Sequence, residues 1–141
     1  MALKYPFAYS LPPVAQALAI LISAGSAAQS AEIAWKLNEE TAQSLAAAAT
    51  GHSRTPEALD YQGTDTDPLF FVFYGPNPPP AMGGFGYFAV NPWTGDVWDL
   101  WGCYKLSTPA LRKSQAEIRR GFTHEELKQY RRLVRLKPDC I

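Results

Sequence analysis

The chain has 141 residues, of which 47% are hydrophobic and 13% aromatic. This length and composition fit one packed domain and exclude a wholly disordered chain. Thirteen basic and thirteen acidic residues give a formal net charge of zero. The balance predicts no broad electrostatic surface for nucleic acid or an anionic membrane, so we expect partners to be recognised by shape and local chemistry.

Residues 1–28 have the pattern of a secretory signal peptide. Lys4 is their only charged residue, residues 15–22 are apolar, and small residues lead to a cleavage site after Ala28, with Ser30 as the second choice. The alternative is a short leader helix in the cytosol. The apolar run is much shorter than a membrane span requires. We therefore expect an exported protein without a stable membrane span, in which residues 29–141 form one domain.

The only two cysteines are Cys103 and Cys140. An even pair in a small exported domain favours a disulfide, which would tie the C-terminal tail to the rest of the fold. Two free buried thiols in a cytosolic protein are the alternative. Together with the signal peptide, the pair predicts a periplasmic or secreted location.

Residues 31–50 predict a long helix, because they are rich in Ala and Glu and contain neither Pro nor Gly. Ser30 is a candidate cap at its start, and Gly51 would end it. The predicted buried stripe consists of Ile33, Leu37, Thr41, Leu45 and Ala48. Small residues beside this stripe would let the helix lie close to a sheet.

Two stretches directly after this helix predict strands. Residues 58–62 suggest a short strand in a polar, turn-rich region, and the continuous run 69–74 predicts a central strand buried on both faces. The connection that follows, residues 75–84, contains four prolines and ends in two glycines. It is either an ordinary long hairpin loop or a stiff wedge that is preorganised to contact a partner.

A hairpin is predicted from residues 85–90 and 97–101, with residues 91–96 as its turn. Pro92 can preset one turn residue and Gly95 can supply a positive φ. Strand alternation places Trp98 and Leu100 on one face and Val97, Asp99 and Trp101 on the other. One tryptophan face should lie beneath the long helix, whereas the other is either exposed near Trp93 and Tyr104 or covered by the last helices.

Two short helices should end the chain. Thr108 and Pro109 introduce a helix over residues 109–120, and Thr123 with Glu126 forms a capping box for a helix through about Arg135. The second helix ends in a basic cluster made of Arg131, Arg132, Arg135 and Lys137. We interpret this cluster as a solvated face.

Few residues suggest catalysis. The two histidines, His52 and His124, are too few for a histidine-rich metal site, and no phosphate-binding, zinc-protease or nucleophile-elbow motif occurs. Cys103 with His124 as base is formally available, but a disulfide and a capping histidine are the simpler interpretation. Asp96 fits a turn and Asp99 an outward strand position. We therefore predict neither an enzyme nor a cofactor or metal site.

The helix that begins at residues 31–37 and the hairpin of residues 87–100, with its Thr94-Gly95-Asp96-Val97 turn, resemble PepSY-like, cystatin-like or NTF2-like small exported bacterial proteins. The proline-rich loop, the two C-terminal helices and the cysteine pair are additions to that pattern. The resemblance implies an α+β fold in which a long N-terminal helix packs on an antiparallel sheet of three or four strands, followed by two short helices.

The resemblance also implies a function, because PepSY-like modules restrain peptidases and small exported helix-and-sheet proteins include immunity partners of toxins. We expect a non-enzymatic inhibitor or immunity protein that binds an envelope-acting effector, hydrolase or peptidase and no nucleic acid. Its predicted contact residues are Pro79, Pro80, Met82, Trp93 and Tyr104.

Two other classes of function remain open. One is a small-ligand-binding or catalytic NTF2-like domain with a pocket between helix and sheet, near His52, Asp99 or Tyr87. The other is a structural envelope component that forms homodimers or larger assemblies through an exposed sheet edge.

Overall fold

The computed structural model describes residues 33–50, 55–65 and 69–141. The chain divides into two units, Met1–Ala31 and Glu32–Ile141, and every described residue belongs to the second. The predicted signal peptide, its cleavage sites after Ala28 and Ser30, and His52 lie outside the described residues. No helix in the described ranges is both long and apolar enough to cross a bilayer.

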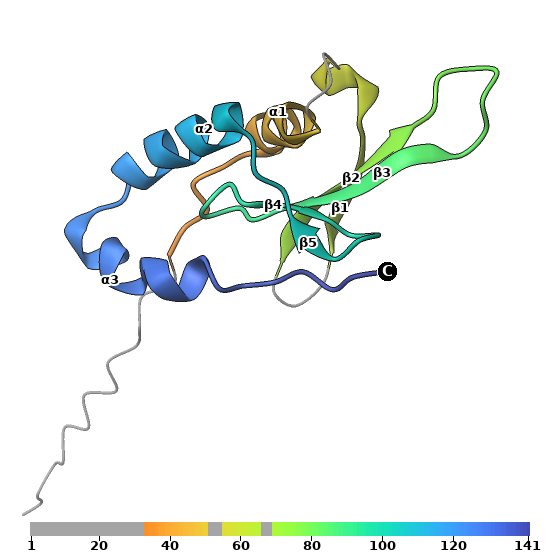
Figure 1. Ribbon diagram of the computed structural model, residues 1–141. Helices are drawn as coiled ribbons and strands as arrows, with labels where there is room; N and C mark the ends of the chain where they lie inside the picture. The colour runs from red at the N-terminus through yellow and green to blue at the C-terminus, as the bar shows by residue number, and fades with distance from the viewer. Residues whose placement is uncertain (1–32, 51–54, 66–68) are drawn as a thin grey trace, which may run out of the picture. The chain divides into compact units, whose positions relative to one another are not determined.

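The second unit is an α+β fold, as predicted. Its elements in chain order are α1 (Glu39–Ala49), a 3₁₀ turn (Pro56–Ala58), β1 (Asp60–Asp65), β2 (Phe70–Pro76), β3 (Gly84–Val90), β4 (Val97–Asp99), β5 (Tyr104–Lys105), α2 (Pro109–Arg120) and α3 (His124–Leu133). Figure 1 shows α1 and α2 on one side of the sheet and the C-terminal tail on the other.

The sheet has five strands instead of the predicted three or four. Each strand pairs antiparallel with the next one along the chain, in the order β1-β2-β3-β4-β5. Phe73 pairs with Phe88, and Val90 pairs with Val97 across the predicted hairpin. The additional strand, β5, has only two residues and pairs with β4. Because every strand lies beside the next one along the chain, the sheet is a simple antiparallel meander.

The prediction of one long helix over residues 31–50 is wrong. The helix begins at Glu39, where the side chain of Asn38 caps it by accepting a hydrogen bond from the Thr41 N–H at 2.9 Å. Residues 33–37 are not helical. The amides of Lys36 and Leu37 instead donate to the carbonyl of Pro92 at 2.9 and 3.1 Å. Tertiary hydrogen bonds to the β3–β4 turn therefore override the helix propensity of this segment.

The predicted buried stripe is only partly correct for the same reason. Thr41 and Ala48 are exposed, whereas Leu45 is buried. With Ile33 and Leu37 outside the helix, its buried face is set by Ala42, Leu45, Ala46 and Ala49, which follow helical spacing. The small alanines let α1 lie close against the sheet.

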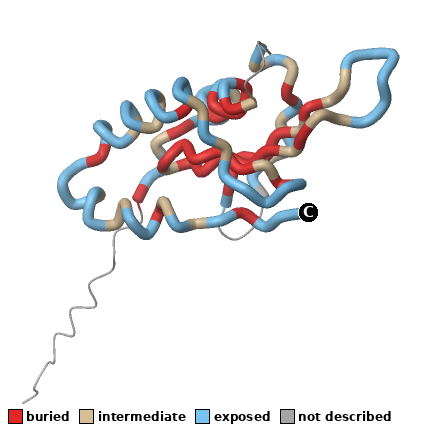
Figure 2. The backbone as a smooth tube through the Cα atoms, viewed as in Figure 1, coloured by how far each residue is buried: buried red, intermediate tan, exposed pale blue. Residues whose placement is uncertain are grey.

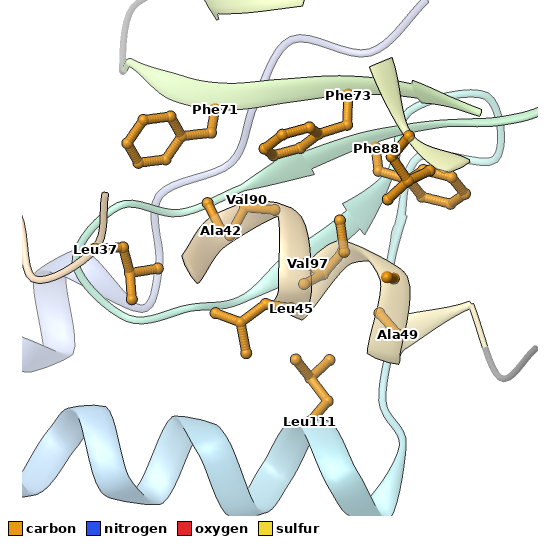
Figure 3. Packing of buried hydrophobic residues seen from close by; sticks show 13 residues of the cluster. Leu37, Ala42, Leu45, Ala49, Phe71, Phe73, Phe88, Val90, Val97 and Leu111 are labelled. Carbon is orange, nitrogen blue, oxygen red and sulfur yellow. The ribbon is translucent and has the colours of Figure 1, made fainter. Parts of the chain in front are cut away.

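The main core fills the space between α1, α2 and the sheet. Figure 3 shows the side chains of Phe71, Phe73 and Phe88 directed from the strands toward α1, with Leu111 of α2 closing the far side. Phe73 and Leu111 are fully buried. The predicted pocket between helix and sheet is therefore occupied by packed apolar side chains.

The opposite face of the sheet carries a second cluster, which consists of Phe70, Val72, Ala89, Trp98 and Leu100. The prediction that β2 is buried on both faces is thus confirmed. This face is covered by Leu136 and by the tail that follows α3. Trp98 lies here, away from α1, whereas Trp101 follows β4 and is 51% exposed.

The C-terminal helices agree with the sequence analysis. α2 spans the predicted residues, and the Thr108 side chain accepts from the amide of Leu111. α3 begins with the predicted capping box of Thr123 and Glu126 and ends two residues before Arg135. Both starts were predictable because caps are local, and the hydrogen bonds that define them span only a few residues.

Candidate functional site

The connection between β2 and β3, hereafter the β2–β3 loop (residues 77–83), is closed at its base by hydrogen bonds. The amide of Asn77 donates to the carbonyl of Gly83 at 2.9 Å, and its side-chain amide donates to the carbonyl of Met82 at 3.1 Å. Ala81 donates to Pro78 within the loop at 3.1 Å. These bonds and the prolines restrict the conformations that the loop can adopt.

Aromatic rings pack over two glycines where the β2–β3 loop joins the sheet. A Cβ atom on Gly75 would lie 2.3 Å from the Phe85 ring, and one on Gly84 would lie 2.4 Å from the Tyr74 ring. Only glycine leaves room for these rings. Gly75 and Gly84 thus help to fix the base of the loop.

The tip of the β2–β3 loop is exposed, apolar and uncharged. Met82 is 93% exposed, and Pro79 and Pro80 are also exposed. No charged residue occurs between Phe70 and Val90. Figures 1 and 2 show the β2–β3 loop projecting away from the sheet, with almost no buried residue in it. Its chemistry fits a concave apolar site on another molecule.

Trp93, a second predicted contact residue, is half-buried in the body of the protein. Its indole N–H donates to the carbonyl of Ile33 at 2.7 Å, and its ring packs beside Phe122 and Leu133. Trp93 follows the end of β3, whereas the β2–β3 loop precedes its start. Seven strand residues separate two such points by about 20 Å, so the structure does not bring Trp93 and Met82 together.

Asn91 holds the β3–β4 turn in place, and the sequence analysis did not identify it. Its side chain is fully buried, accepts from the amides of Trp93 and Thr94, and donates to the carbonyl of Leu133 at 3.0 Å. Gly95 has a positive φ of 72°, as the turn prediction requires. An asparagine directly after a strand was the only signal for this role.

Tyr104 lies in β5 and is 53% exposed. Its ring packs over Gly102, where an added Cβ would lie 2.3 Å away. Across the sheet, Tyr104 pairs with Asp99 of β4, and Asp99 pairs with Phe88 of β3. Phe88 lies four residues beyond Gly84, where the β2–β3 loop ends. Tyr104 therefore presents a surface separate from both the β2–β3 loop and Trp93.

The predicted disulfide is present. Cys103 and Cys140 are bonded, with their Cα atoms 5.6 Å apart. The amide of Ile141 also donates to the carbonyl of Leu100 at 3.2 Å. The tail is thus fastened to the sheet covalently and by a hydrogen bond. Because Cys103 is oxidised, it has no thiol to act as a nucleophile with His124.

A pocket of about 270 Å³ lies between this tail and the second face of the sheet. We call it the tail pocket. It is lined by Gln62, Val72, Tyr87, Ala89, Leu100, Pro138, Asp139, Cys140 and Ile141. Of the three residues predicted near a ligand pocket, Tyr87 lines the tail pocket. Asp99 does not line it, and its side chain accepts from the amide of Gly102. His52 is outside the described residues.

Asp96, the other carboxylate of the predicted hairpin, is occupied by structural contacts. Asp96 accepts from Thr94 and from Lys105, whose Nζ lies 2.9 Å away, and from the Gln115 side chain at 3.2 Å. Within the described ranges, no three His, Cys, Asp or Glu residues cluster in a way that could hold a metal ion.

Two ionisable groups of α3 have shifted pKa values. The pKa of Glu126 is lowered, chiefly because Lys36 donates to its carboxylate at 2.7 Å and the Thr123 amide also donates to it. The pKa of Tyr130 is raised by burial and by the nearby charge of Asp96. Both shifts accompany packing of α3 on the body of the protein, and neither group faces the β2–β3 loop or the tail pocket.

Comparisons of the chain with protein-family models, curated proteins and solved structures find no match.

Proposed function

We propose that this protein is an exported, non-enzymatic inhibitor or immunity protein that inserts its β2–β3 loop into the active-site cleft of an envelope-acting hydrolase. The observation that carries the proposal is the projecting, internally hydrogen-bonded loop with Met82 at its exposed tip. A restrained loop loses little conformational entropy on binding, so an apolar tip of this kind supports tight insertion. Disulfide chemistry supports action in the periplasm or outside the cell.

The loop, with Pro79, Pro80 and Met82, is the primary contact in this proposal. Trp93 and Tyr104 remain predicted contacts on separate surfaces, because neither is near the loop tip. A partner that touched all five residues would have to wrap around the sheet. Separate alanine variants at Trp93 and Tyr104 would show whether it does.

The test is site-specific photo-crosslinking from the loop in cells that export the protein. A benzoylphenylalanine at position 82 should capture one hydrolase in a one-to-one complex, and the same group at exposed Lys113 on α2 should not. The purified hydrolase should then be inhibited stoichiometrically by the wild-type chain. The proposal would be rejected if the captured hydrolase kept its full activity in the presence of the wild-type chain. It would also be rejected if position 82 gave no adduct that position 113 lacks.

Matched substitutions at the loop tip sharpen the test. Met82→Leu keeps the tip apolar and should preserve inhibition, whereas Met82→Asp should weaken binding by about tenfold or more, because a charge would be buried in the complex. The fold should tolerate both, since Met82 is 93% exposed. Equal binding by both variants would contradict insertion of the loop.

The tail pocket supports a second candidate, binding of a small, largely apolar ligand. Its floor consists of Val72, Ala89 and Leu100, with Tyr87 as the nearest hydroxyl. A fragment screen by NMR should then shift the amide signals of these residues. Ala89→Leu should fill the pocket and abolish the shifts; the absence of any binding fragment would exclude this candidate.

A further inference from the structure

The net charge of zero conceals a strong separation of charge along the chain. Residues 105–137, which include α2 and α3, contain ten basic and three acidic residues, a formal charge of +7. Residues 33–104, which include α1 and most of the sheet, contain two basic and eight acidic residues, a formal charge of −6. The part of the chain that forms the two C-terminal helices is therefore strongly basic, and the part before it is acidic.

The basic residues of α2 and α3 are all exposed and follow helical spacing. On α3 and the turn after it, Lys128, Arg131, Arg132 and Arg135 occupy one side of the helix, opposite the buried Leu133. On α2, the corresponding stripe consists of Arg112, Lys113, Arg119 and Arg120. We call the four residues of α3 and the turn after it, Lys128, Arg131, Arg132 and Arg135, the basic face.

Most of the basic face is not neutralised. Lys128 pairs with Glu125 at 2.7 Å, and Arg119 stacks over Tyr130 at 4.9 Å. Among the described residues, no ion pair forms to Lys113, Arg120, Arg131, Arg132 or Arg135. Like charges held side by side in this way repel each other, and an external anionic surface would relieve that repulsion.

We propose that the basic face adsorbs the protein to an anionic phospholipid bilayer. The apolar sides of α2 and α3 are already used, since Leu111 and Leu133 pack into the body, so binding is electrostatic and requires no insertion into the hydrocarbon. An extended row of cations fits a surface of many phosphates better than it fits a single anion. The disulfide favours an oxidising compartment, which argues against nucleic acid as the polyanion.

This inference is independent of the proposed function. In Figure 1 the connection between α2 and α3 and the β2–β3 loop lie at opposite ends of the described unit. Adsorption through the basic face would leave the loop free to reach a partner.

Co-sedimentation of the full chain with vesicles tests the proposal. Vesicles containing about one-third phosphatidylglycerol should bind the protein at about 0.05 M NaCl and release it at about 0.5 M, whereas pure phosphatidylcholine should bind it much less at either salt concentration. Arg131→Gln/Arg132→Gln/Arg135→Gln should weaken binding to the anionic vesicles by about tenfold or more. Thermal unfolding should show that this variant is folded.

A charge-matched control separates the basic face from net charge. Thr41→Glu/Ala48→Glu/Thr64→Glu also lowers the net charge by three, but at exposed positions on α1 and β1. It should bind anionic vesicles like the wild type. The proposal is overturned if the arginine variant and this control behave alike, or if both vesicle types bind equally. It is also overturned if the chain binds only duplex DNA, an acidic protein or a second copy of itself.

Discussion

The two faces of the sheet are covered in different ways. One face packs against α1 and α2 through large aromatic rings and small alanines, and Figure 3 shows these side chains in the space between the strands and the two helices. The other face is covered by Leu136 and an irregular tail that Cys140 ties to Cys103. It retains the tail pocket, and the buried indole N–H of Trp98 finds no acceptor in the described part of the chain.

The difference shows what regular structure and a covalent tie each contribute. A helix satisfies its own backbone hydrogen bonds and offers a continuous apolar stripe, so it can seal a sheet without further help. An irregular tail leaves backbone groups to be satisfied and covers less apolar area, and a disulfide compensates by restricting the unfolded chain. The first face should therefore carry more of the stability, and the second more of the adaptability.

The largest expected effect is on the helix-covered face. Phe73→Ala should lower the free energy of unfolding by about 3–5 kcal/mol, because Phe73 is fully buried and its removal leaves a cavity. Val72→Ala, a change at the neighbouring residue on the pocket side, should lower the free energy of unfolding by only about 1–2 kcal/mol. Urea denaturation measures both. Equal losses would show that the two faces are equally well packed.

Removal of the disulfide tests the tail-covered face. Cys103→Ser/Cys140→Ser should lower the free energy of unfolding by about 2–4 kcal/mol, because the bond closes a loop of 37 residues. Hydrogen exchange should become faster at the Ile141 amide, which bonds to Leu100, while amides of β2 and β3 stay protected in the folded state. Retained protection at Ile141 would show that the tail does not need the bond.

The ion pair between Lys36 and Glu126 joins the segment leading into α1 to α3, and hence the two coverings of the sheet. The pKa of Glu126 in the folded protein is below its ordinary value of 4.5, mainly because of Lys36. The stability that this carboxylate contributes is therefore fully present well above pH 4.5 and lost as the pH falls through the lowered pKa.

Glu126→Gln should therefore lower the urea midpoint at neutral pH, by less than either change above, and the difference from wild type should shrink under acid. Glu125→Gln is the matched control, since the Glu125 pair with Lys128 is largely exposed and should contribute little at any pH. A pH-independent difference for Glu126→Gln would contradict the assigned role of its charge.

The smallest expected effect is at a residue on neither face. Met82→Ala should change the free energy of unfolding by less than about 0.5 kcal/mol, because the side chain is almost fully exposed. Equilibrium denaturation alongside the Phe73 variant gives the scale. A larger loss would mean that the β2–β3 loop supports the fold instead of being available to a partner.

Sequence reasoning predicted the local parts of the candidate sites better than their arrangement. It identified the β2–β3 loop from its prolines and the disulfide from the only two cysteines. It did not identify the tail pocket, because the residues that line it come from three strands, the residue after β4 and the tail, and no sequence spacing joins them. It grouped Trp93 with Met82, although the length of β3 separates them.

The sequence by itself determined the features that depend on neighbouring residues, namely the caps of α2 and α3, the burial of β2 and the turn at Gly95. It also allowed only one cysteine pair within the chain. Only the tertiary structure decided where α1 begins, because the distant carbonyl of Pro92 and the indole N–H of Trp93 bind backbone groups of residues 33–37 and competed successfully with helix formation. It also decided that most of the basic residues of α2 and α3 are exposed and form no ion pair in the described part of the chain. Local patterns report local energies, whereas these outcomes depend on contacts between segments far apart in the chain.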